Sequence, residues 1–491
     1  MWRLLKYAAL LVVLILVVVA TAVGLNTALI GSRQIAVLAV TPEPVDEQNA
    51  AQRLAAAVRF QTIANFLAPD QNADQFTALH AHLERSFPNA HRTLKREAVG
   101  SYSLLYTWEG SDPSAAPILL LAHQDVVPVA PGTEGDWEAP PFDGLIRDGF
   151  VWGRGAWDNK GNLYSIMEAV EALAAQGLRP RRTIYLAFGH DEEVSGRRGA
   201  KAIAELLAAR NVRLAFVLDE GLLVMERALP GLEKPAALIG VAEKGYVTLL
   251  LQLSTTPGHS SMPPRRSAIG MMSAALARLE DRSFPPALRG VARDMFETLA
   301  PEMQGINRVL FSNLWLFRPL VQRELARSAS SDAMLRTTTA LTIVSAGNKD
   351  NVLPGRAEAT VNFRLLPGDT QASVIAHTRG AIDDGGITIK PDSFNSEPSP
   401  VTPMQSEGYA MLARTIREVF PETVVAPGLM IAATDSRHFI GIADNIFRFS
   451  PVRATPQDLT RFHGTNERIA IENYAEMIRF YRRLIRNAAG L

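Results

Sequence analysis

The sequence contains no cysteine. That absence excludes disulfide scaffolds, thiolate zinc sites, iron–sulfur clusters and cysteine nucleophiles. The chain also lacks an excess of either charge, because 50 Lys and Arg residues balance 50 Asp and Glu residues. A neutral chain has no basic surface of the kind that nucleic-acid-binding proteins use, so we expect no nucleic acid among its partners. Any bound metal must therefore be held by His, Asp and Glu.

The N-terminus carries a charge-free apolar stretch over residues 7–32, preceded by Arg3 and Lys6. A membrane-spanning helix needs about 20 apolar residues, whereas the core of a signal peptide has about 7–15. The length favours a retained transmembrane anchor over residues 1–33. A cleaved signal peptide and a buried helix of a soluble protein are the alternatives. In the first two interpretations the rest of the chain is exported to the periplasmic or extracellular side, membrane-anchored or secreted.

The length of 491 residues predicts two folded units after this segment. Strand patterns alternate with helical patterns, first at 48–66 and 74–87 and later at 161–176 and 199–209. This alternation predicts an α/β catalytic domain whose mostly parallel sheet is flanked by helices. The expected strands lie at 102–108, 118–123, 183–189 and 214–218.

From about residue 244 the order of elements changes to strand, helix, strand, strand, helix, strand. That order is typical of a ferredoxin-like α+β unit, here interrupted by an insertion at 283–338. We therefore expect the catalytic domain in two parts, at 34–243 and 396–491. The ferredoxin-like domain would be inserted between them at 244–395.

Acidic and histidine side chains gather where the expected strands of the catalytic domain end. They are His123 with Asp125, then Asp158, then Asp191 with Glu192 and Glu193, and finally Asp219. Ligand sites of open α/β sheets form beyond the carboxyl ends of the strands. One strand-end Asp is usually a helix cap or a turn residue, but four such clusters indicate a site for cations. Oxygen ligands with imidazole suit zinc, with Mn²⁺ or Co²⁺ as alternatives, and the number of ligands suffices for two ions.

Six motifs along the chain resemble the zinc-dependent exopeptidase family that includes carboxypeptidase S, aminoacylase and succinyl-diaminopimelate desuccinylase. The resemblance covers residues 42–491 and is greatest to carboxypeptidase S and the N-fatty-acyl-amino-acid synthase/hydrolase. It implies a di-zinc exopeptidase domain with an inserted lid domain. The motifs are ILLLAHQDVVPV at 118–129, GRGAWDNKG at 153–161, GHDEEVSG at 189–196, VLDEG at 217–221, PGHSSMPP at 257–264 and HGTNERI at 463–469.

The resemblance implies a ligand set for two Zn²⁺ ions. His123 and Asp219 would bind the first ion, Glu193 and His463 would bind the second, and Asp158 would bridge both. In the family the peptide bond after the bridging Asp is cis.

The resemblance also implies that Glu192 is the general base and that Asp125 orients His123. His123 and Asp125 are two residues apart at a strand end, so their side chains share a face. A carboxylate beside a ligating His fixes the tautomer of the imidazole. Spacing alone leaves the reverse assignment open, with Glu192 as the ligand and Glu193 as the base.

Five further residues match positions that contact substrate in the family: His259, Asn351, Arg364, Thr434 and Arg437. His259 resembles the lid histidine that stabilises the developing oxyanion and that, in dimeric members, comes from the second subunit. A homodimer through the lid domain is the corresponding expectation. An arginine binds a carboxylate bidentately, so either Arg364 or Arg437 would bind the carboxylate of the substrate. A structural salt bridge is the alternative for both arginines.

The insertion is rich in apolar side chains, which usually indicates core packing or an interface. The more specific hypothesis is that these side chains form the wall of a binding site for a fatty acyl chain or contact the membrane surface. The side chains are those of Phe284, Phe296, Leu310, Phe311, Leu314, Trp315, Leu316, Phe317, Leu320 and Val321.

Taken together, the sequence predicts a metal-dependent hydrolase that cleaves the amide bond of N-acyl amino acids or small peptides next to a free carboxylate. The reverse reaction would make the chain an N-fatty-acyl-amino-acid synthase. One alternative is a carboxypeptidase or dipeptidase without lipid preference. The other is a binding protein on the same fold that has lost catalysis, against which the complete ligand set argues.

Overall fold

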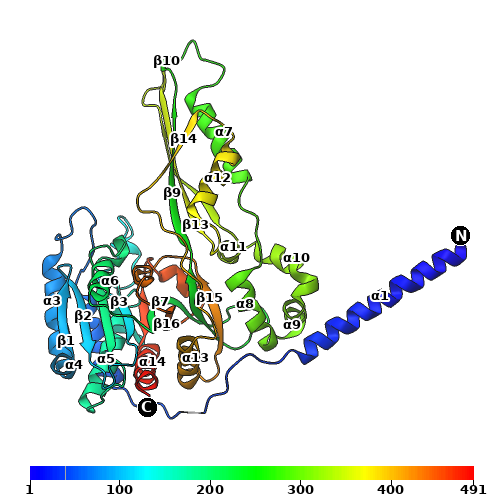
Figure 1. Ribbon diagram of the computed structural model, residues 1–491. Coiled ribbons are helices and arrows are strands. Elements are labelled where there is room, and N and C mark those ends of the chain that lie inside the picture. The colour runs from blue at the N-terminus through cyan, green and yellow to red at the C-terminus, as the bar shows by residue number, and fades with distance from the viewer. Residues whose placement is uncertain (39, 491) are drawn as a thin grey trace.

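The structure is a computed structural model that describes residues 1–38 and 40–490. Helix α1 (Trp2–Leu29) projects away from a two-part body, and a long antiparallel unit rises from the larger, α/β part (Figure 1). None of the residues of α1 is buried, so the alternative of a buried core helix is wrong.

The α/β part is built on a mixed sheet of eight strands. Only the central strands β6, β3, β7 and β16 run parallel to one another, and β15 runs parallel to β8. Four of the seven neighbouring strand pairs are thus parallel, as expected. The antiparallel pairs are β1–β2, a tight hairpin through Gly100 and Ser101 with positive φ, β2–β6 and β16–β8. In sheet order the strands are β1 (Lys95–Val99), β2 (Ser103–Trp108), β6 (Ile184–Gly189), β3 (Ile118–His123), β7 (Phe216–Met225), β16 (Ile446–Ala454), β8 (Ala236–Glu243) and β15 (Val424–Met430).

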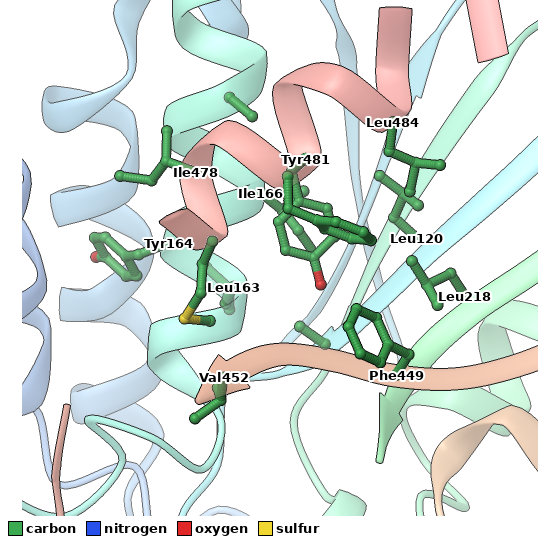
Figure 2. Packing of buried hydrophobic residues seen from close by; sticks show 14 of the residues in the cluster. Leu120, Leu163, Tyr164, Ile166, Leu218, Phe449, Val452, Ile478, Tyr481 and Leu484 are labelled. Carbon is green, nitrogen blue, oxygen red and sulfur yellow. The ribbon is translucent and has the colours of Figure 1, made fainter. Parts of the chain in front are cut away.

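Helices cover both faces of this sheet. Leu120 and Leu218 point to the face covered by α5 and α14, where Tyr481 and Leu484 pack on them (Figure 2). Leu119 of β3 points to the other face, which α6 covers. The alternation follows from the two-residue period of a strand. The helices are α2 (Glu47–Val58), α3 (Ala73–Ser86), α4 (Pro88–Thr93), α5 (Lys160–Ala175), α6 (Ala200–Ala209), α13 (Glu407–Val419) and α14 (Ile471–Ala489).

The antiparallel unit has the strand–helix order predicted from residue 244. Its sheet contains β11 (Thr338–Ala346), β13 (Arg356–Leu365), β9 (Gly245–Ser254) and β14 (Ile387–Pro391), in that order. Helices α7 (Ala268–Asp281) and α12 (Gln371–Ile382) pack on one face of the sheet. At the tip, β10 (Gly258–His259) pairs with β12 (Val352–Leu353) (Figure 1). A separate three-stranded sheet contains β17 (Arg468–Ala470), β5 (Phe150–Trp152) and β4 (Leu145–Arg147).

The insertion is helical and divides its apolar residues between two environments. Its helices are α8 (Gly290–Leu299), α9 (Gly305–Ser312), α10 (Leu314–Leu325) and α11 (Ala329–Leu335). Phe296, Leu314 and Val321 are buried in one cluster with residues of β8 and β15, as the packing hypothesis expects. Trp315 and Leu320 of α10 are instead 59% and 54% exposed.

Candidate active site

The chemistry-bearing side chains meet at the carboxyl ends of the central parallel strands. His123 is the last residue of β3, and a 3₁₀ turn at Glu192–Val194 follows β6. Asp219 and Glu220 lie within β7, where the pairing with β16 shifts register beside Gly221. The sheet therefore delivers side chains from three neighbouring strands to one place.

Two groups of ligand atoms share the carboxylate of Asp158. In the first group, Nε2 of His123 lies 3.1 Å from Oδ1 of Asp158 and 3.4 Å from Oε1 of Glu220. In the second, Nε2 of His463 lies 2.8 Å from Oδ2 of Asp158 and 3.3 Å from Oε2 of Glu193. One carboxylate thus faces two imidazoles, each of which lies beside a further glutamate.

Asp125 contacts both His123 and the turn that carries Glu192 and Glu193. It is fully buried, and its Oδ1 lies 3.3 Å from Nδ1 of His123. Its two carboxylate oxygens also accept hydrogen bonds from the backbone N–H groups of Glu192 and Glu193, at 3.2 and 3.0 Å. Asp125 therefore contacts the imidazole, through its carboxylate and at 3.0 Å through its backbone oxygen, and fixes the turn that carries both glutamates.

Glu467 was not singled out from the sequence, and it holds the loop of Asp158. Its buried carboxylate accepts hydrogen bonds from Arg154 and from the backbone N–H groups of Gly155, Trp157 and Asp158. Because Glu467 closes the HGTNE motif, it joins the loop of His463 to the loop of Asp158. The peptide bond between Asp158 and Asn159 is cis, as expected.

Asp219 lies in neither group of ligand atoms, and Glu220 takes the third place in the first group. The buried carboxylate of Asp219 accepts hydrogen bonds from the backbone N–H groups of Ser436 at 2.7 Å and Glu220 at 2.8 Å. The sequence signal for Glu220 is its place in VLDEG beside Asp219. The local shift of the strand that turns it toward His123 has no signature in the sequence.

The site is rich in carboxylates that burial keeps from ionising easily. Burial raises the pKa of Glu193 to about 7, that of Glu220 to about 8 and that of Asp219 to about 6, and neighbouring carboxylates add to the shifts of Glu193 and Glu220. The pKa of Glu192 is raised well above its usual value, again mainly by burial. Conversely, hydrogen bonds that its imidazole donates to the carboxylates of Asp158 and Glu193 raise the pKa of His463 to about 10.

These residues fit divalent cations. Imidazole and carboxylate are suitable zinc donors, and Oε1 of Glu193 is buried without a hydrogen-bond partner in the described part of the chain. Cations would also neutralise carboxylates that otherwise repel one another. His123, Asp158 and Glu220 would hold one ion and Asp158, Glu193 and His463 the other.

A cavity of about 1160 Å³ opens beside this site. Glu192, Glu193 and His463 line one part of it, and Arg364 and Arg437 line another. Among the described residues, none from the insertion at 283–338 lines this cavity, so the hypothesis of an acyl wall there lacks support.

The other substrate-contact candidates lie elsewhere. Thr434 is fully buried and donates its hydroxyl to Glu243 at 2.9 Å. His259 and Asn351 lie together at the tip of the antiparallel unit, outside the residues that line the cavity.

Comparison with known proteins agrees with the family resemblance. A match to the peptidase family M20/M25/M40 covers residues 119–487. The probable carboxypeptidase S-like 2 of Dictyostelium discoideum is 43% identical over 473 residues, which are 94% of this chain and 91% of that protein. The N-fatty-acyl-amino acid synthase/hydrolase PM20D1 of Mus musculus is 42% identical over 444 residues, 89% and 87% of the two chains.

Solved structures share the fold. The M20 family metallo-carboxypeptidase Sso-CP2 from Sulfolobus solfataricus superimposes with a TM-score of 0.65 at 18% identity, over 91% of this chain and 100% of that one. Human carnosine dipeptidase 1 gives 0.62 at 16% identity, over 91% and 97%. The sequence matches and the shared fold confirm the resemblance, and this chain belongs to the M20 family of metallopeptidases.

Proposed function

We propose that this protein is a two-zinc amide hydrolase that releases an amino acid with a free carboxylate from an N-acyl amino acid or a small peptide. The observation that carries the proposal is the shared carboxylate of Asp158 between two imidazole–glutamate groups, beside a cavity whose wall includes Arg364 and Arg437. Zinc bound there supplies Lewis-acid polarisation of the amide carbonyl and activates water. The names of the relatives, carboxypeptidase S-like and N-fatty-acyl-amino acid synthase/hydrolase, support both substrate classes.

Glu192 is the general base in this proposal. Its side chain lines the cavity, and its backbone is fixed by the hydrogen bond to Asp125. Glu192 takes a proton from the attacking water and transfers it to the amide nitrogen as the C–N bond breaks. The contact between Glu193 and His463 supports the assignment of Glu193, rather than Glu192, as the ligand.

Arg364 is the residue that we assign to the carboxylate of the substrate. Arg437 already donates a hydrogen bond to the backbone oxygen of Ser195 at 3.1 Å. The guanidinium of Arg364 stacks over the ring of Tyr246. It donates no side-chain hydrogen bond to any residue that the structure describes, so it is available to bind a carboxylate. Its position in the cavity wall supports recognition of a free carboxylate near the scissile amide.

The first test follows amino-acid release by the zinc-loaded protein from N-oleoyl-phenylalanine, N-acetyl-phenylalanine and Gly-Leu. Chelator-sensitive release that Glu192→Gln abolishes is the expected result. Preference for the oleoyl substrate identifies a lipid amidase, and preference for Gly-Leu identifies a dipeptidase. Wild-type turnover by Glu192→Gln would refute the role of the base.

Arg364→Met tests recognition of the carboxylate, with Arg265→Met, at an exposed position outside the cavity lining, as its matched control. We expect Arg364→Met to lower kcat/KM for N-acetyl-phenylalanine by about 10²-fold or more, since a charged hydrogen-bonded pair is lost. N-acetyl-phenylalanine amide, which lacks the carboxylate, should show no such difference. An equal loss on both substrates would assign Arg364 a structural role.

Within residues 1–38 and 40–490, one helix, α1, is long and apolar enough to cross a membrane. We further propose that α1 is retained as an anchor and that residues 244–395 form a lid and dimerisation domain. The exposed position of His259, away from the cavity of its own chain, supports a role in the site of a second copy. Mixing the inactive variants His259→Ala and Glu192→Gln should then restore part of the activity, and no recovery in a mixed dimer would contradict this role.

A further inference from the structure

One face of the C-terminal third of α1 lies against the body of the protein. Val19, Val23, Thr27 and Ile30 are partly buried, whereas the residues between them are exposed. Their spacing of three to four residues places them in one stripe along the helix axis. The partner of this stripe is α9, at the end of the insertion nearest to α1 (Figure 1).

Polar contacts fix this packing at the junction between α9 and α10. Asn313 is fully buried, and its Nδ2 donates a hydrogen bond to Oγ1 of Thr27 at 2.9 Å. Nδ2 of Asn26 donates to the backbone oxygen of Ser312 at 2.6 Å and to Oδ1 of Asn313 at 3.1 Å. Arg308 reaches the backbone oxygen of Thr27. A buried amide with several partners specifies one geometry, so the base of α1 has a defined seat on the insertion.

The surface beside this seat is apolar, aromatic and basic. Leu316 and Leu320 are exposed, and Trp315 is exposed while its Nε1 donates to Oδ1 of the same Asn313. Arg318 and Arg323 are also exposed and form no ion pair with any described residue. Exposed Trp and Leu combined with unpaired arginines are typical of helices that lie at the lipid headgroups.

The length of α1 decides where a bilayer would end. Residues 7–26, counted from the first residue after Lys6, span about 30 Å at 1.5 Å per residue. A hydrocarbon core is about 30 Å thick. The membrane boundary therefore falls near Asn26, which donates hydrogen bonds to Ser312 and Asn313 of the insertion.

We propose that α9 and α10 (residues 305–325) form a membrane-interface surface, which seats the catalytic body on the same lipid bilayer that α1 enters. Trp315, Leu316 and Leu320 lie among the headgroups, and Arg318 and Arg323 bind anionic lipid. The proposal rests on the retention of α1 as an anchor. It explains why side chains of the insertion that neither pack in the core nor line the cavity are apolar.

The absence of cysteine makes the test direct, because one introduced cysteine carries one label. An environment-sensitive fluorophore is attached to the cysteine of full-length Leu320→Cys, Val12→Cys or Leu67→Cys. Each labelled protein is then reconstituted into vesicles of phosphatidylcholine and phosphatidylglycerol, with and without brominated lipid. We expect blue-shifted emission and quenching by the brominated lipid at positions 12 and 320. Position 67, which is 90% exposed on the α/β part, should show neither effect.

Three outcomes would overturn the proposal. An unquenched label at 320 beside a quenched label at 12 would refute the interface while retaining the anchor. An unquenched label at 12 would refute the anchor and, with it, this inference. Disulfide formation between two Leu320→Cys chains, without quenching at 320, would assign the surface to a second copy.

Charge reversal provides a second measurement. We expect Arg318→Glu with Arg323→Glu to remove the quenching at position 320 in anionic vesicles, because like charges repel the helix from the headgroups. The matched control reverses Arg265 and Arg379, two exposed arginines of the antiparallel unit. Quenching that survives in the first variant, or disappears equally in the second, would contradict the role of the two arginines.

Discussion

Glu467→Gln tests how the loops of the site are held together. In the native protein one oxygen of Glu467 accepts three backbone N–H groups, at 2.9, 2.9 and 3.0 Å, and the other lies 2.6 Å from Nη1 of Arg154. The amide oxygen of glutamine can keep the three backbone bonds. The NH₂ group of the glutamine then faces the guanidinium of Arg154, and two hydrogen-bond donors cannot bond to each other. The buried Arg154 also loses its charged partner.

The expected cost is large because both partners are inaccessible to water. Removal of one member of a buried ion pair costs about 3–5 kcal/mol. Arg154 keeps its hydrogen bonds to the backbone oxygens of His463 and Gly464, so we expect the lower half of that range. The loops that carry Asp158 and His463 also lose their common tie, and the loss of such a supporting contact lowers metal affinity by about 10–100-fold.

Urea denaturation followed by tryptophan fluorescence measures the first effect, and zinc competition with a chromophoric chelator measures the second. Glu476→Gln is the matched control, because Glu476 pairs with Arg453 away from the ligand groups. A Glu467→Gln protein with unchanged zinc affinity and a stability within about 1 kcal/mol of the wild type would refute this reasoning.

Three further predictions concern charge. Burial alone would raise the pKa of Glu418, but hydrogen bonds from neighbours that include Arg483 lower it to about 2, so its stabilisation is lost as pH falls from about 4.5 to 2. In urea denaturation Glu418→Gln should therefore cost about 2–3 kcal/mol at pH 7 and progressively less below pH 4. Glu220→Gln and Asp219→Asn should both lower the affinity of one zinc site in chelator titrations. The variant with the larger loss of zinc affinity identifies the direct ligand. Unchanged zinc affinity in both variants would contradict the proposed site. In the metal-free protein the pKa values of Glu193 and Glu220 are raised, so between about pH 5 and 8 the folded state binds more protons than the unfolded state. The Tm of the metal-free protein should therefore fall as the pH rises from about 5 to 8. The Tm of the zinc-loaded protein should change less over the same range.

Much of the fold could be predicted from the sequence where a local pattern determines the element. The order of helices and strands from β9 to β14 follows from periodicity, and the helix at 74–87 is one residue out of step with α3. The helix expected at 48–66 ends at Val58, and beyond it Ile63 forms a parallel bridge with Val126, just after β3. Strand β8 was missed: its long pairing is with β15, which is distant in the sequence, and only Ala236 and Ala237 pair with the preceding strand β7.

The site was predictable to the extent that its residues end strands. His123, Asp158, Glu193 and His463 come together as expected, although they are separated by up to 340 residues. Glu220 was not singled out although it lies beside Asp219 in VLDEG, because the register shift between β7 and β16 at this point has no signature in the sequence.

The residues that set the geometry share a property that sequence reasoning did not exploit. Glu467 pairs with Arg154, Glu243 with Arg448, and Asn313 with Thr27, and each pair is separated by more than 200 residues. Each pair includes a charged or amide side chain that is fully buried or nearly so.

A buried polar group without a partner costs free energy, so an isolated charge or amide inside an otherwise apolar segment implies a partner elsewhere in the fold. Arg448 in NIFRFSPV and Asn313 in VLFSNLWLF are such cases. The sequence alone shows that each side chain requires a polar partner, but it does not identify that partner. In the structure, Arg448 meets the glutamate that also holds Thr434, beside the cavity, and Asn313 meets the base of α1. The same physical requirement therefore positions the loop of Thr434 and holds the base of α1, so substitution of either residue by a leucine should disturb a contact made more than 200 residues away.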